Sequence, residues 1–254
     1  MALIDTHCHL DVEEFDADRL EVLRRARAAG VDGIIVPAIH AAGWPGLIAL
    51  CAGEPDLYPA LGLHPVYLDQ HRDGHLKDLE RLIAETRPVA VGEIGLDFFL
   101  PELDRARQQA LFEAQLAIAR TAGLPVLIHA RKSHDQVLAT LRRIRVPGGI
   151  AHAFSGSLDQ ARQYLDLGFC LGFGGMLTFE RSRKIRALAR ALPLEAIVLE
   201  TDAPDLTVAA HRGERNSPEY LPDVLAALAE VRAEDPALLA AATTGNARAL
   251  LGLH

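Results

Sequence analysis

Short apolar runs alternate with longer amphipathic segments along the whole of the 254-residue chain. The short runs are rich in Val, Ile and Leu, as in strands buried on both faces, and the longer segments repeat apolar residues at helical spacing. The runs predict strands at residues 3–6, 33–36, 58–61, 89–93, 126–129, 149–153, 169–173 and 196–200. The amphipathic segments predict helices at residues 18–29, 44–52, 76–85, 105–122, 133–143, 158–166, 182–191, 218–232 and 236–251.

This alternation predicts an α/β fold of the (β/α)8 TIM-barrel type, which typically needs about 250 residues. Gly30, Gly123 and Gly168 directly follow predicted helices, where glycine commonly ends a helix. A doubly wound open sheet is the alternative. The barrel is favoured because the rhythm continues without a linker and because polar residues follow many different strands. We therefore expect residues 1–254 to form a single barrel domain.

Composition narrows the setting of this fold. Half of the residues are hydrophobic, yet no apolar run is long enough for a membrane span, and no targeting segment is evident. The three cysteines, Cys8, Cys51 and Cys170, are widely spaced and predict reduced thiols in a cytoplasmic protein. The net charge of −8 argues against broad adhesion to nucleic acid. A nucleic-acid substrate remains compatible with it, because bound cations can reverse the potential at one site.

Metal-binding residue types follow the predicted strands. His7 and His9 are separated by one residue, so in an extended segment both rings face one side and Cys8 faces the other. Further candidates stand at or beyond the ends of later strands: His64, Glu93, His129, His152 and Asp202. The carboxyl ends of barrel strands ring one mouth, so we expect these groups to converge there.

The repetition of these residues carries the metal prediction. Any one of the histidines alone is more commonly a hydrogen-bonded structural residue, but the same pattern at strand after strand favours ligands. The set suits two divalent ions about 3.5–4 Å apart, bridged by a carboxylate and a water. Mg, Mn and Zn all accept such ligands, so the sequence leaves the metal open. Five other histidines fall in loops or at helix edges, and we expect most of them to be solvated: His40, His71, His75, His211 and His254.

Six segments make the sequence similar to a known family. They are DTHCHLD (5–11), GLHP (62–65), GEIGLD (92–97), LPVLIHAR (124–131), HAFSGS (152–157) and ETDAPDL (200–206). In this order they resemble the TatD family of metal-dependent deoxyribonucleases, a branch of the amidohydrolase-like barrels, and residues 172–178 resemble a less characterised subgroup. The resemblance implies that His7, His9 and Asp202 hold one ion and that His129 and His152 hold the other. Glu93 would bridge the two.

The resemblance also implies a reaction, which the predicted site can support. Two metal ions lower the pKa of a bridging water toward about 7, neutralise a phosphate and stabilise the leaving oxygen. We therefore expect hydrolysis of DNA phosphodiester bonds through a metal-bridging hydroxide, as a 3′–5′ exonuclease on single strands. Asp202 would orient or deprotonate the attacking water, or would serve as a plain ligand. No membrane and no obligate protein partner are expected, and the chain is expected to be monomeric.

Other residues near the mouth are candidate substrate contacts. His64 would contact a phosphate or support a ligand, and Arg131 would offer paired donors to a phosphate, unless it lies on a helix surface. Ser155 precedes a predicted helix whose start can bind an anion, although an N-cap needs only Ser157. Basic residues at 181–186, with Arg212 and Arg215, would guide a phosphate chain unless they are solvated charges. Phe98 and Phe99 pack in the core or a loop, or flank a base.

Two other functions fit the same sequence. An ester or amide hydrolase, for example an aminoacyl-tRNA deacylase, would use the same site and would be indicated by a deep pocket with one specificity-setting side chain. An open basic cleft would indicate a nuclease. A non-catalytic, metal-bearing binding protein is the other alternative, and the complete set of six ligands argues against it.

Overall fold

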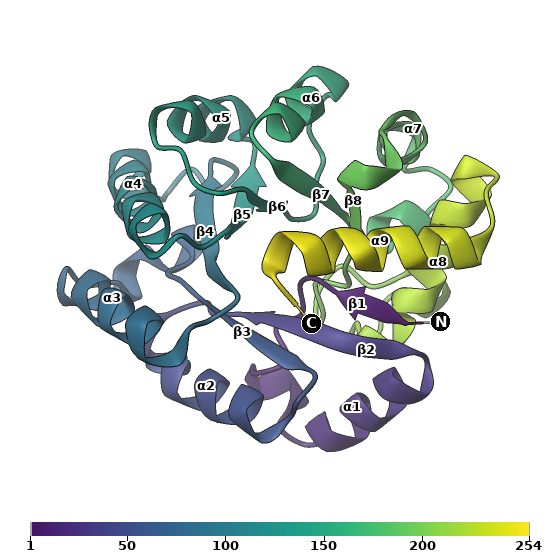
Figure 1. Ribbon diagram of the computed structural model, residues 1–254, viewed down its shortest axis with the longest axis horizontal. Coiled ribbons are helices and arrows are strands. Elements are labelled where there is room, and N and C mark those ends of the chain that lie inside the picture. The colour runs from purple at the N-terminus through teal and green to yellow at the C-terminus, as the bar shows by residue number, and fades with distance from the viewer. Residues whose placement is uncertain (1, 254) are drawn as a thin grey trace.

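Parallel strands form a nearly closed barrel in the computed structural model, which describes residues 2–253. In that range eight strands pair in the order β1 to β8, and helices surround them (Figure 1). The strands are β1 Leu3–Asp5, β2 Val31–Pro37, β3 Leu57–Leu61, β4 Ala90–Asp97, β5 Val126–Arg131, β6 Gly149–Ala151, β7 Phe169–Phe173 and β8 Ile197–Leu199. The predicted (β/α)8 barrel is confirmed, and the doubly wound sheet is excluded because neighbouring strands follow the chain order all the way round.

Helices follow the strands and pack their apolar faces on the barrel. They are α1 Arg19–Ala28, α2 Trp44–Gly53, α3 Gly74–Thr86, α4 Arg105–Ala122, α5 His134–Arg143, α6 Leu158–Asp166, α7 Arg183–Ala191, α8 Leu221–Arg232 and α9 Pro236–Leu251. The predicted helix 218–232 is divided, since a 3-10 turn at Pro218–Tyr220 precedes α8. Pro222 lies in the first turn of α8, where its missing N–H costs no hydrogen bond.

Single hydrogen bonds close the ring between its first and last strands. The backbone N–H of Thr6 donates to Leu199 at 3.0 Å, and that of Asp202 donates to His7 at 2.8 Å. The His9 N–H donates to Ala203 at 2.8 Å. These bonds join the segment after β1 to the segment after β8, so the two chain segments with candidate ligands His7, His9 and Asp202 are fixed side by side.

One end of the barrel interior is apolar, and the other end is polar. Each strand contributes one residue to a buried inner cluster, which α9 extends: Ile4, Ile35, Ala60, Ala90, Leu127, Ile150, Cys170, Val198, Ala247 and Leu251. Helix α9, yellow in Figure 1, lies across the apolar end, since its Ala247 and Leu251 belong to this cluster. Its Asn246 amide also donates to the carbonyls of Leu194 and Ile197, just before and at the start of β8. The opposite end, at the carboxyl ends of the strands, is therefore the polar mouth.

Two central strands run further than their sequences predict. The predicted strand ends at residues 93 and 129 are wrong, because β4 continues to Asp97 and β5 to Arg131, with Asp97 paired to Arg131. Glu93 consequently lies in the middle of β4, and its side chain is buried. Arg131 is the last residue of its strand and does not lie on the first turn of a helix.

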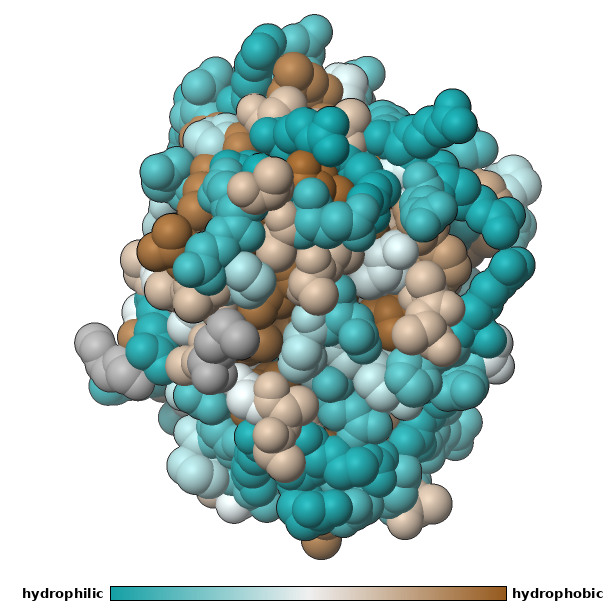
Figure 2. Space-filling model, turned by 90° about the vertical axis from the view of Figure 1, so that its right-hand side faces the viewer, coloured by the Kyte–Doolittle hydropathy of each residue, from teal (hydrophilic) through white to brown (hydrophobic). Residues whose placement is uncertain are grey.

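The molecular surface is polar where helices face the solvent. Figure 2 shows a face on which hydrophilic residues dominate and hydrophobic residues occur mostly as small groups between them. In the described part of the chain, no helix combines the length and the apolar character needed to cross a membrane.

Candidate metal centre

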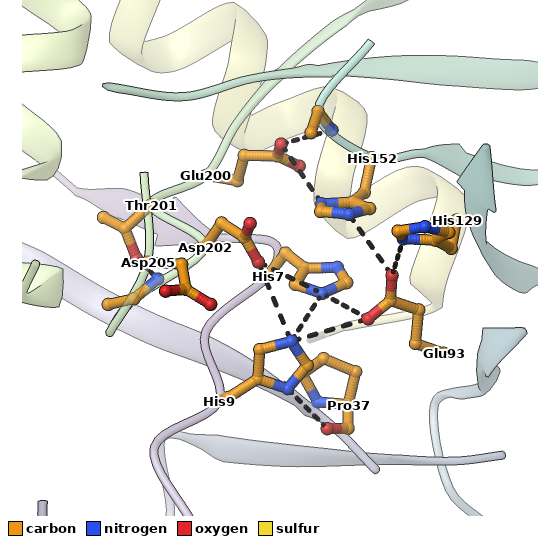
Figure 3. Close-up of polar contacts among 12 residues, drawn as sticks. His7, His9, Pro37, Glu93, His129, His152, Glu200, Thr201, Asp202 and Asp205 are labelled. Atoms are coloured by element: carbon orange, nitrogen blue, oxygen red, sulfur yellow. Dashed lines mark hydrogen bonds and ion pairs between the residues drawn. The ribbon is translucent and has the colours of Figure 1, made fainter. Parts of the chain in front are cut away.

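Glu93 lies at the centre of a group of histidines (Figure 3). Its Oε2 is 3.1 Å from Nε2 of His7 and 3.5 Å from Nε2 of His9. Its Oε1 is within 3.3 Å of ring nitrogens of three more histidines: His64, His129 and His152. One buried carboxylate therefore faces a different set of imidazoles with each of its oxygens.

His7, His9 and Asp202 form the first possible ligand group. The Nε2 atoms of His7 and His9 are 3.3 Å apart, and Oδ1 of Asp202 is 3.7 Å from each of them. Asp202 adopts a left-handed backbone with φ of 60°, which is uncommon for a residue with a side chain. That conformation and the hydrogen bond from its N–H to His7 turn the segment after β8 toward the first strand.

The rings of His9 and His129 are oriented by partners outside the centre. Nδ1 of His9 donates to the Pro37 carbonyl at 3.1 Å, so the neutral ring has its lone pair on Nε2, which faces Glu93. Nε2 of His129 donates to Asp97 at 3.0 Å, so Nδ1 is directed at Glu93. Protein ligands to metals are commonly oriented by such outer hydrogen bonds. Inward lone pairs beside carboxylate oxygens fit a cation, which would relieve their mutual repulsion.

Burial and neighbouring charges shift the pKa values of the residues at the centre in opposite directions. Burial disfavours the charged form of Glu93, but His64, His7 and His152 outweigh it and hold the pKa of this carboxyl well below its usual range. Burial also opposes protonation of His9, but Glu93 and Asp202 raise its pKa to about 9. Burial raises the pKa of Asp202 to about 6, against the effect of neighbouring histidines. Charges here are balanced by one another, as expected of a buried site that takes up cations.

Glu200 supports His152 from behind. Its Oε1 accepts the Ala153 N–H at 2.6 Å and lies 3.5 Å from Nδ1 of His152. Within residues 2–253, both Oε2 of Glu200 and Nδ1 of His152 are buried without a hydrogen-bond partner. Gly172 makes room for this carboxylate, because a Cβ there would be 2.0 Å from Oε2. A small rotation of either side chain would complete an imidazole–carboxylate pair.

His64 differs from His9 and His129 in which ring nitrogen carries the proton, because the nitrogen that faces Glu93 is the protonated one. Its Nδ1 accepts the Val66 N–H at 3.2 Å, so the neutral ring has its proton on Nε2, 3.3 Å from Glu93. Burial lowers the pKa of His64 to about 4. His64 is therefore placed as a neutral donor beside the centre, where it can donate to an oxygen of Glu93 or of a substrate. His71 fixes this position, since its Nε2 donates to the His64 carbonyl at 2.8 Å.

The expectation that His71 is solvated is wrong, because the side chain is buried. His40, His75 and His211 are only partly exposed, and His254 lies outside the described residues. The sequence analysis did not single out His134, whose buried ring has Nδ1 3.2 Å from the Tyr164 hydroxyl. Glu200 and Asp97 were also missed as site residues, although both lie inside the family-like segments, where their proximity to Asp202 and Glu93 was the available signal.

A cavity of about 950 Å³ opens above the centre. Its lining includes five of the six candidate ligands, all except His7: His9, Glu93, His129, His152 and Asp202. Asp11, Glu13, Glu14 and Asp205, here called the acidic wall, line it on the segments after β1 and β8. Arg131 lines it at the end of β5, which lies across the barrel from that wall. The charge of the cavity is therefore uneven from side to side.

The three candidate substrate contacts lie at the cavity. His64, Arg131 and Ser155 all line the cavity. The start of α6 is closed by a capping box, in which Ser157 and Gln160 satisfy each other's N–H groups, so Ser157 is the N-cap. Ser155 is exposed, and its carbonyl accepts a hydrogen bond from Lys184 at 2.6 Å.

Ion pairs weaken the predicted attraction of a phosphate chain by the basic residues at 181–186, Arg212 and Arg215. Arg186 lies 2.6 Å from Glu230, and Arg215 lies 2.7 Å from Asp18. These two guanidinium groups are thus neutralised by carboxylates of the protein itself.

Comparisons with known proteins show which family the chain resembles. A model of the family described as "TatD related DNase" matches residues 4–252. The Escherichia coli K12 protein named "Uncharacterized metal-dependent hydrolase YjjV" is 42% identical over 254 residues, covering 98% of each chain. A Klebsiella pneumoniae protein named "3'-5' ssDNA/RNA exonuclease TatD" is 34% identical over 258 residues, covering 99% of this chain and 98% of that protein.

Solved structures show the same architecture. The crystal structure of YjjV from Escherichia coli has a TM-score of 0.96 to this chain at 41% identity, covering 99% of this chain and 98% of that one. An amidohydrolase from Saccharomyces cerevisiae, at 20% identity and a TM-score of 0.86, shares the fold.

Proposed function

The chain belongs to the TatD-related DNase family and is a metal-dependent hydrolase, and we propose that it cleaves phosphodiester bonds of single-stranded DNA from the 3′ end with two divalent ions. The observation that carries this proposal is the position of Glu93, whose two carboxylate oxygens face different histidines. Its Oε2 faces His7 and His9, and its Oε1 faces His129 and His152. A carboxylate in that position is suited to bridge two cations.

In this proposal, His7, His9 and Asp202 hold one ion, and His129 and His152 hold the other. Ions held there would acidify a water molecule and neutralise the negative charge of a phosphate. The ligand types accept Mg, Mn or Zn. Exonuclease activity of the Klebsiella relative supports the choice of nucleic acid.

The protein's own groups then bind and orient the substrate. Asp202 lines the cavity beside His7 and His9, where its carboxylate can accept a proton from the attacking water. His64 donates from Nε2 toward the reacting phosphate, and Arg131 offers paired donors to a non-bridging oxygen. Ser155, exposed at the cavity rim, contacts the strand further out.

Digestion of an oligonucleotide tests the proposal directly. Metal-stripped protein is supplied with Mg or Mn and mixed with a 5′-labelled single-stranded DNA. We expect a ladder that shortens from the 3′ end and is absent with chelator or in the Glu93→Ala variant. Failure of every metal to produce cleavage would overturn the assignment to DNA.

The acidic wall favours a second candidate function. Asp11, Glu14 and Asp205 line the cavity and would attract a cationic group such as the free amine of an aminoacyl ester. An aminoacyl-tRNA would bring both that amine and a carbonyl for the same centre. The test is release of amino acid from charged tRNA by the protein that fails to degrade DNA.

A further inference from the structure

We propose that Phe99, Arg131 and Lys132 form a nucleotide-binding shelf beside the metal centre, on which a base and its phosphate rest next to the scissile bond. The shelf rests on the proposed function, since it names how the same site holds a single strand of nucleic acid. Phe99 follows β4, and the two basic residues end and follow β5.

Phe99 is held in an exposed position by the backbone. Its side chain is 44% exposed, although large apolar side chains are usually covered. The Phe98 N–H donates to the Arg131 carbonyl at 2.8 Å, which extends the β4–β5 pairing. The Phe99 N–H donates to Oδ1 of Asp97 at 2.9 Å. The ring is thus presented to solvent by ordered strand ends.

Two cations lie against this ring. The guanidinium carbon of Arg131 is 3.7 Å from the ring centroid, and Nζ of Lys132 is 4.8 Å from it. Within the described range, no carboxylate lies at ion-pair distance from either residue, in contrast to Arg186 and Arg215. Their positive charge is therefore available to an incoming anion.

Lys132 reaches the ring through an unusual backbone. Successive residues of a strand point to opposite sides, so Lys132 would face away from Arg131 if β5 continued. It instead adopts a left-handed conformation with φ of 55°. Such conformations are unfavourable for residues with a side chain and are often kept at functional sites. Here the turn brings a second cation to the aromatic ring. Arg131 lies over one face of this ring, and the base would stack on the part that stays exposed.

Asp97 connects the shelf to the metal centre. Its Oδ1 accepts the Phe99 N–H, and its Oδ2 accepts from Nε2 of His129, each within 3.0 Å. Arg131 lies two residues beyond His129 on the same side of β5 and lines the cavity. Phe99 and Lys132 are not among the residues that line the cavity, so the shelf extends outward from Arg131 at the rim of the cavity.

Charge and shape identify the occupant as a nucleic-acid strand. The acidic wall repels phosphates on the β8–β1 side of the cavity, which favours approach of an anionic chain along the β4–β5 side, where the shelf lies. A planar base stacks on an aromatic ring irrespective of its sequence, and adjacent cations take the phosphates. The low overall aromatic content, 5%, fits one stacking position and not a long groove.

Oligonucleotide binding and cleavage test the shelf through Phe99→Ala, Phe99→Trp and Lys132→Ala. The matched control is Leu238→Ala, which removes another exposed apolar side chain in α9, away from the mouth. Dissociation constants of a fluorescent single-stranded 12-mer are measured by anisotropy in chelator, so binding is read without turnover. KM is measured with the same oligonucleotide and with bis(p-nitrophenyl) phosphate, which has no neighbouring nucleotide.

We expect Phe99→Ala to weaken oligonucleotide binding about tenfold, the equivalent of one lost base stack. KM for the oligonucleotide should rise much more than KM for bis(p-nitrophenyl) phosphate, and Phe99→Trp should restore binding. Lys132→Ala should reduce the salt dependence of binding by about one phosphate contact. Leu238→Ala should behave as the wild type.

The outcomes separate the shelf from the proposed function. Equal oligonucleotide binding by wild type, Phe99→Ala and Lys132→Ala would overturn the shelf, whatever the cleavage results. Wild-type protein that binds the oligonucleotide through Phe99 but cleaves neither compound would overturn the proposed function and leave the shelf as a binding site.

Discussion

The carboxylate of Asp5 accepts hydrogen bonds from both the backbone N–H and the hydroxyl of Thr201, at 2.9 and 2.5 Å. Both residues are fully buried, and the pair joins the end of β1 to the segment after β8. Oδ1 of Asp5 also accepts the His7 N–H at 3.2 Å. Since Asp202 directly follows Thr201, one carboxylate fixes the backbones of two candidate ligands where the barrel closes.

Thr201→Val should destabilise the fold. The substitution keeps the β-branched shape but leaves Oδ2 of Asp5 buried without its hydroxyl donor, which costs about 1–3 kcal/mol. The free energy of unfolding is measured by urea denaturation of metal-free protein. Thr121→Val is the control, because that exposed hydroxyl bonds only within helix α4. Equal stabilities of the two variants would show that the Asp5–Thr201 contact contributes little.

Glu93→Ala should abolish activity and metal uptake while leaving a folded barrel. The variant removes the carboxylate that faces both ligand groups, so we expect activity to fall by more than about 100-fold. Bound metal is counted by atomic absorption after dialysis, and circular dichroism reports the fold. Retained turnover together with full metal content would contradict the bridging role of Glu93.

Glu200→Gln should weaken metal binding without removing a ligand. The amide keeps the acceptor for Ala153 but loses the negative charge next to Nδ1 of His152, so the ring is oriented less strongly. Changes of this kind typically cost about 10–100-fold in metal affinity. Calorimetric titration with Mn measures the effect, with Glu195→Gln, on an exposed side chain, as control. An affinity like that of the control would rule out this support.

His134 should make the fold sensitive to acid. Burial, and secondarily Lys184, lower its pKa from 6.5 to about 4, so the unfolded chain binds a proton between these values that the folded chain excludes. Stability is therefore complete above about pH 6.5 and falls as the pH drops toward 4, by about 3 kcal/mol from this residue. Urea denaturation at both pH values should show a smaller loss for His134→Gln. The same loss in both proteins would refute this source of acid sensitivity.

Local signals in the sequence were sufficient for many of the elements. The bounds of α4, α6, α9 and β7 agree with the predicted ranges. In α4, the side chain of Asp104 accepts the N–H groups of Ala106 and Arg107, and Gly123 ends the helix in a left-handed conformation. Such caps depend on residues a few positions apart, so the sequence alone reveals them.

The ends of β4 and β5 depended on distant residues. The segment Ile94 to Asp97 continues as strand because it pairs with Ile128 to Arg131, more than thirty positions along the chain. The pairing places Phe99 against Arg131, a contact that no local pattern indicates. For the same reason the sequence placed Arg131 on a helix surface as readily as in the mouth.

The sequence by itself determined the alternation of strands and helices and the types of residue that follow each strand, because periodicity and motif spacing are local properties. Tertiary structure decided how those residues work together. Burial lowers the pKa of His64, whereas the nearby carboxylates of Glu93 and Asp202 raise that of His9 in spite of burial. Contacts with Pro37 and Asp97 select which ring nitrogens of His9 and His129 face Glu93. These effects come from residues that are far apart in the sequence and meet only when the barrel closes, so local sequence patterns do not reveal them.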